Sequence, residues 1–144
     1  MRVARLIGND SRLNGIFGNS NIEASLYAIG IFCAVALVCG AERKWQRILF
    51  TVTLSFSAFA FLLVFSMGAI ACFIAAVAAY LIFAGKGRSA VLLRMLSAAV
   101  PTLVCGFIAF ALFNSERGTL VLALLLANAG VSVLLELTVS ARLS

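Results

Sequence analysis

The stretch ILFTVTLSFSAFAFLLVFSMGAIACFIAAVAAYLIFA, residues 48–84, decides the fold, because it contains no charged residue from end to end. As one helix it would be roughly 55 Å long, whereas the hydrocarbon core of a bilayer is about 30 Å thick. Helix tilt cannot absorb so large an excess. We therefore predict two membrane spans here, separated by a tight turn near Ser66-Met67-Gly68.

The composition of the whole chain agrees with a membrane protein. Of its 144 residues, 64% are hydrophobic and 11% are charged, whereas a soluble domain is about 45–50% apolar and about 25% charged. These values exclude a water-soluble globule, a disordered tail and a nucleic-acid-binding domain. A β-barrel would show alternating segments of about ten residues, and here the apolar runs are continuous. The expected fold is all-α, a polytopic transmembrane helical protein.

Three further apolar runs raise the expected number of spans to about five. They are residues 22–40, 98–113 and 119–138. Ser20 or Asn21 would cap the first of them. Pro101, the one proline of the chain, would lie near the start of the span 98–113, where a helix tolerates proline best.

Basic segments on either side of residues 48–84 indicate the orientation. The cations are Arg43, Lys44 and Arg47 before this stretch, and Lys86, Arg88 and Arg94 after it. Cationic loops are retained on the cytoplasmic side, so both segments are expected there and the Ser66 turn on the outside. The chain then divides into an external N-terminal loop, residues 1–21, and a transmembrane helical region, residues 22–144.

The external loop contains the most specific motif of the chain, RLNGIFGNSN at residues 12–21. It resembles the signature of the O-antigen ligase and O-antigen polymerase superfamily, in which an arginine, a glycine and an aromatic residue precede Asn-x-Asn at the start of a transmembrane helix. The matching residues are Arg12, Gly15, Phe17, Asn19 and Asn21. Ser66-Met67-Gly68 resembles a later Ser-Arg-Gly motif of the family, with Met67 in place of the arginine.

The resemblance implies a glycosyltransferase of bacterial cell-envelope polysaccharide synthesis, with several spans in the cytoplasmic membrane. Such proteins transfer or polymerise glycans carried on a polyprenyl diphosphate. The carrier-linked glycan and the lipid bilayer are the implied partners, and neither a metal nor another cofactor is implied. Arg12 would be the catalytic and diphosphate-binding residue, because the planar guanidinium binds phosphate oxygens in a bidentate way. The remaining substrate-binding residues would be Gly15, Phe17, Asn19, Asn21 and Ser66.

The resemblance covers only part of a family protein. Family members have more spans and a large external loop with a catalytic histidine, and this chain contains no histidine. We therefore expect a truncated, split or degenerate relative, in which the substrate-binding part of the site lacks its base. Missing spans of the same system would be further partners.

Two alternatives stay open from the sequence. One is a small oligomeric transporter that exchanges protons at an acidic residue, which predicts that Glu23 faces a central cavity. Glu23 and Glu136 are the acidic residues nearest the membrane, and both are expected to reach water at span ends. The other alternative is a non-catalytic membrane fragment, in which Arg12 only binds lipid headgroups. Asn128, in the middle of a span, offers a hydrogen bond across helices, but close packing beside the small residues Ala127, Ala129 and Gly130 is the role expected of it.

Overall fold

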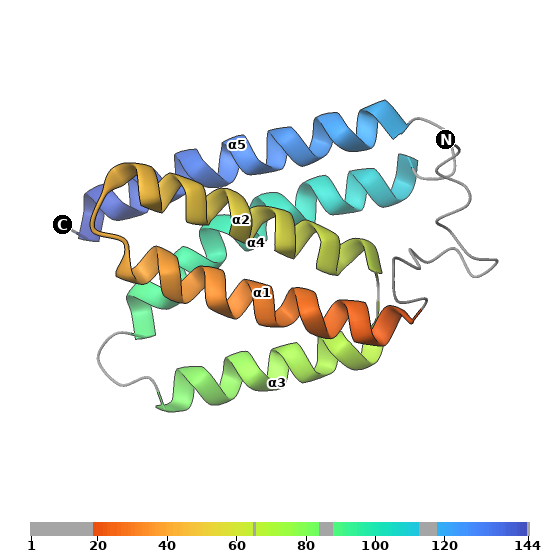
Figure 1. Ribbon diagram of the computed structural model, residues 1–144, viewed down its shortest axis with the longest axis horizontal. Coiled ribbons are helices and arrows are strands. Elements are labelled where there is room, and N and C mark those ends of the chain that lie inside the picture. The colour runs from red at the N-terminus through yellow and green to blue at the C-terminus, as the bar shows by residue number, and fades with distance from the viewer. Residues whose placement is uncertain (1–18, 65, 84–87, 113–117, 144) are drawn as a thin grey trace.

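The computed structural model describes residues 19–64, 66–83, 88–112 and 118–143, and within these ranges every element is a helix. The helices are α1 (Ser20–Gly40), α2 (Lys44–Val64), α3 (Met67–Phe83), α4 (Arg88–Leu112) and α5 (Gly118–Leu143) (Figure 1). The predicted all-α fold is thus confirmed. Arg12, Gly15 and Phe17 lie outside the described residues.

The lengths and surfaces of the helices are those of a polytopic membrane protein. Helices α1, α2, α4 and α5 are long and apolar enough to cross a membrane. Helix α3 is apolar but has 17 residues, which corresponds to about 26 Å and lies at the short limit for a span. Large apolar side chains cover the outside of the bundle: Phe83 is 85% exposed and Phe107 77% exposed. Such a surface is stable against lipid and not against water.

The long apolar stretch is divided where the sequence predicts. Helix α2 ends at Val64 and α3 begins at Met67. Ser66, the residue before α3, caps this helix. Its carbonyl oxygen accepts from the Ile70 N–H at 2.9 Å, and its Oγ accepts from the Ala69 N–H at 3.3 Å. A serine oxygen at this position satisfies N–H groups that have no partner within the helix.

Helix α2 lies at the centre of the bundle, in contact with α1, α4 and α5, while α4 packs along α5. Small residues allow α1 and α2 to approach closely: a Cβ added to Gly30 would lie 3.3 Å from Ser57 Oγ. Helix α3 contacts mainly α1 and has no buried residue. It runs along the lower edge of the bundle in Figure 1. It is therefore the most loosely packed of the five helices.

The two ends of the bundle differ in chemistry. We call the end with the start of α1 and the α2–α3 connection the motif end, because Asn19, Asn21 and Ser66 lie there (right in Figure 1). The opposite end holds the α1–α2 connection, the start of α4 and the last turn of α5, and we call it the basic end. Its described cations are Arg43, Lys44, Arg47, Arg88 and Arg142. The Ser66 turn is thus opposite the basic segments, as predicted.

Several predicted boundaries are wrong. Helix α2 begins at Lys44 rather than Ile48, and α5 extends to Leu143 rather than Thr138. The cap of α1 is Asn19, whose Oδ1 accepts from the Asn21 N–H at 2.9 Å, and not Ser20 or Asn21.

The start of α4 is the largest error. This helix begins at Arg88, so Pro101 lies in its interior, where it has no N–H to donate to the Ser97 carbonyl. Arg94 is a buried residue of α4 and not a loop residue. The physical reason is that Glu136 of α5 compensates its charge.

Candidate functional site

Asn21 and Ser66 bring the two motif segments together at the motif end. Ser66 Oγ donates to Asn21 Oδ1 at 2.5 Å, although the residues are 45 positions apart in sequence. Asn21 lies in the first turn of α1 and Ser66 in the α2–α3 connection. Ser66 is 2% exposed, whereas Asn19 and Asn21 are exposed. The hydrogen bond therefore joins a buried hydroxyl to an amide at the surface.

Two helices begin at this hydrogen bond, α1 at Ser20 and α3 at Met67. A helix N-terminus presents unpaired N–H groups and a partial positive charge, both of which favour anions. Glu23 lies in the first turn of α1 and is buried, so it adds a negative group to the same region. Met67 is exposed, and the motif end therefore has a thioether at the surface where the family motif has a cation.

Of the predicted site residues, the structure describes three and brings them together. Asn19 bonds to Asn21, and Asn21 bonds to Ser66. The predicted positions Arg12, Gly15 and Phe17 lie outside the described residues, so the contacts of this arginine remain a prediction.

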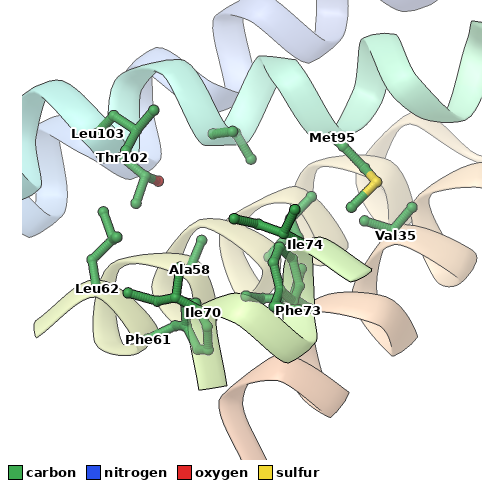
Figure 2. Close-up of a pocket in the computed structure, with 14 residues that line it drawn as sticks. Val35, Ala58, Phe61, Leu62, Ile70, Phe73, Ile74, Met95, Thr102 and Leu103 are labelled. Atoms are coloured by element: carbon green, nitrogen blue, oxygen red, sulfur yellow. The ribbon is translucent and has the colours of Figure 1, made fainter. Parts of the chain in front are cut away.

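An apolar cavity of about 370 Å³ lies between α3 and α4, with α1 and α2 forming its floor (Figure 2). Ile70, Phe73 and Ile74 of α3 approach it from one side, and Met95, Thr102 and Leu103 of α4 face it from the other. Its lining is almost entirely hydrocarbon, so it suits an alkyl or prenyl chain. Glu23 does not line this cavity.

A second polar region crosses the bundle interior, and the sequence did not predict that its members meet. Helix α5 places Asn128, Ser132, Glu136 and Ser140 four residues apart, which puts all four side chains on one face. They meet Ser55 of α2 and three residues of α4, which are Arg94, Ser97 and Thr102. We call these eight residues the polar seam. The four-residue spacing on α5 was the available signal in the sequence.

Glu136 and Arg94 form the charged part of the seam, toward the basic end. Arg94 Nη1 lies 3.6 Å from Glu136 Oε1 and donates to the Val38 carbonyl of α1 at 2.5 Å. Ser140 Oγ donates to Glu136 Oε1 at 2.9 Å, and Ser97 Oγ lies 3.3 Å from Oε2. Glu136 is 2% exposed and Glu23 5% exposed. The expectation that both carboxylates reach water is therefore wrong, because both side chains are buried.

Asn128 forms the neutral part of the seam. Its Nδ2 donates to the Ser55 carbonyl at 3.4 Å, and its amide and the Thr102 hydroxyl are 3.2 Å apart. Ser132 Oγ lies 3.4 Å from Ser55 Oγ. Asn128 thus hydrogen-bonds to both α2 and α4, beyond the packing role expected of it, and is fully buried. This part of the seam holds three helices together.

Within the described ranges, no group of three or more Cys, Asp or Glu side chains could hold a metal ion. Comparison of the chain with protein-family models, with curated proteins and with solved structures finds no match. The function is therefore inferred from the residues of the chain itself.

Proposed function

We propose that the chain binds a polyprenyl-diphosphate-linked glycan at the motif end, as the carrier-binding part of an O-antigen ligase-like transferase in a bacterial cytoplasmic membrane. The hydrogen bond between Ser66 Oγ and Asn21 Oδ1 carries this proposal. It joins the only two segments that resemble the family motifs, and the proposal requires both at one membrane face.

The chemistry of a lipid diphosphate fits the motif end. Arg12 would bind the phosphate oxygens through charge-assisted hydrogen bonds, and the first turn of α3 would favour the same negative charge. Gly15 and Phe17 precede α1 and would shape the entrance for the carrier. Met67 supplies no second cation, so Arg12 is assigned the main electrostatic role.

The apolar cavity supplies a place for the prenyl chain. Leu62 and Ile70 line it, and they lie one helical turn before and after Ser66. A carrier whose diphosphate meets Asn21 and Ser66 can therefore extend its first prenyl units between α3 and α4. Because α3 is loosely packed, this opening needs little rearrangement.

The complete transfer also needs a base that removes the proton of the acceptor hydroxyl. Within the motif end, no described residue is assigned this role. We therefore assign carrier binding to this chain, and activation of the acceptor to other spans or loops of the same system.

Binding of a short-chain polyprenyl diphosphate to the full chain in nanodiscs tests the proposal. Loss of one charge-assisted interaction of about 1.5–3 kcal/mol lowers affinity roughly tenfold to a hundredfold, and we expect this loss for Arg12→Ala. Arg43→Ala is the matched control, because Arg43 is an exposed arginine at the basic end, and it should leave affinity unchanged. Equal affinities of wild type and Arg12→Ala, or equal losses in both variants, would contradict the proposal.

A further inference from the structure

The cations at and near the basic end fall into two groups, and the first group is engaged within the bundle. Arg47 Nη2 donates to the Ala41 carbonyl at 2.9 Å. Arg94 Nη1 donates to the Val38 carbonyl at 2.5 Å. The last carbonyls of a helix have a partial negative charge, and these two guanidinium groups offset it at the end of α1. The first group therefore serves the packing of the helices.

The second group lies on the outside of the basic end, and we call its members the surface cations. They are Arg43, Lys44, Arg88 and Arg142, all of which are exposed. Within the described ranges the one ion pair is that of Arg94 with Glu136, so no described carboxylate pairs with a surface cation. Among the described acidic residues, only Glu42 is exposed at this end. The surface here thus has four positive charges against one negative charge.

Exposed aromatic side chains lie at the same end of the bundle. Trp45 is 57% exposed in the first turn of α2, and Tyr80 is 43% exposed in the last turn of α3 (Figure 1). Tryptophan and tyrosine are enriched where hydrocarbon meets water. One turn further along α2, the exposed side chains of Ile48 and Leu49 begin the apolar surface. In a bilayer, the surface cations would therefore lie at the level of the lipid headgroups.

The backbone adds to the positive charge of this surface. Helix α2 begins at Lys44 and α4 at Arg88, and the first N–H groups of a helix have a partial positive charge. Gln46 Oε1 accepts one N–H at the start of α2, that of Arg43, at 3.2 Å. Side chains and backbone at this end thus favour the same kind of ligand, an anion.

We propose that the basic end binds the headgroups of anionic phospholipids through the surface cations. The phosphate oxygens of a headgroup accept charge-assisted hydrogen bonds from arginine and lysine. The basic end is also expected to face the cytoplasm, where the leaflet is anionic.

This lipid site is independent of the carrier site proposed at the motif end. Helix α1 joins the two ends and has 21 residues, which corresponds to about 30 Å. The two sites would therefore bind phosphates of opposite leaflets, and the failure of one proposal leaves the other standing.

Trp45 provides the test, because it is the one tryptophan of the chain and is adjacent to Lys44. The full chain is reconstituted in phosphatidylcholine vesicles with a small fraction of brominated lipid, since bromine quenches tryptophan fluorescence on contact. At equal mole fraction, brominated phosphatidylglycerol should quench Trp45 more than brominated phosphatidylcholine. We expect a local enrichment of roughly fivefold for each cation that a headgroup contacts. Equal quenching by the two lipids would overturn the proposal.

Charge substitutions beside Trp45 give a second measurement. Arg43→Gln combined with Lys44→Gln should lower the enrichment, whereas Arg43→Lys combined with Lys44→Arg keeps both charges and should preserve it. Glu42→Gln removes the exposed carboxylate and should raise the enrichment, which damage to the fold would not do. An unchanged enrichment in the double Gln variant, or a lower one in Glu42→Gln, would contradict binding through the surface cations.

Discussion

At the scale of single residues, Asn21 and Glu136 show how polar groups survive in a chain made largely of hydrocarbon. Each lies in or beside an apolar helix, and each has a partner from a distant part of the sequence, Ser66 and Arg94 respectively. A polar group without such a partner is costly in lipid. These residues therefore determine which helices can pack together.

Ser66→Ala removes one hydroxyl with two roles, as the partner of Asn21 and as an acceptor for the Ala69 N–H. From the usual cost of losing a helix cap, we expect the free energy of unfolding to fall by about 1–2 kcal/mol. Unfolding in detergent with increasing sodium dodecyl sulfate measures this change. Ser25→Ala removes a hydroxyl that donates to the Asn21 carbonyl of its own helix, and it should cost less.

The pairing itself is tested by combining Ser66→Ala with Asn21→Ala. Residues in direct contact do not contribute independently, so the double variant should lose less stability than the two single variants together. Strict additivity would contradict the contact between the two motif segments.

The ion pair of α4 and α5 makes a different prediction. Arg94→Met leaves a buried carboxylate without its cation, which typically costs about 3–5 kcal/mol. Arg94→Met combined with Glu136→Leu removes both charges and should recover most of this loss. The same unfolding assay measures both, with Arg88→Met at the exposed start of α4 as the control. A double variant as unstable as the single one would argue against a direct pairing.

At the scale of the helices, the sequence predicted the boundaries that depend on hydropathy and length. It did not predict those that depend on contacts between helices. The turn at Ser66 was predictable because one helix over residues 48–84 would be too long for a bilayer. The start of α4 was missed because Arg88 and Arg94 suggest a loop until Glu136 is known to face Arg94. Asn128 and Glu136 were singled out from the sequence, but their contacts with α2 and α4 were not predicted, although the four-residue spacing on α5 was visible.

Close packing of α1 against α2 depends on Gly30. A Cβ at this position would approach Ser57 Oγ to 3.3 Å, so Gly30→Leu must push the helices apart. We expect a loss of about 1–3 kcal/mol, which is usual for overpacking, measured by unfolding in detergent. Gly130→Leu is the control, because a Cβ there meets nothing within 4 Å. A smaller loss for Gly30→Leu than for Gly130→Leu would contradict the close approach.

At the scale of the whole molecule, the two ends of the bundle carry different polar groups. The motif end has exposed asparagines and the starts of α1 and α3, and the basic end has most of the described cations. The positive-inside rule predicts that the basic end faces the cytoplasm. The motif end would then face the outer side, where transfer from a lipid carrier is proposed.

This orientation predicts which positions a membrane-impermeant maleimide reaches in intact cells. In a chain without its native cysteines, Asn19→Cys should be labelled from outside, because it is exposed at the motif end. Glu42→Cys, exposed at the basic end, should be labelled only after the membrane is opened. Labelling of both positions from the same side would contradict the arrangement of α1 as a span.

The most direct test of carrier binding at the motif end is cross-linking with a polyprenyl diphosphate that has a photoreactive group beside the diphosphate. After irradiation of the full chain in liposomes, mass spectrometry identifies the modified peptides. We predict adducts on the first turn of α1 and on residues around Ser66, reduced by Arg12→Ala and unchanged by Arg43→Ala. Adducts on the α1–α2 connection at the basic end, or none above the level of unrelated membrane proteins, would contradict the account.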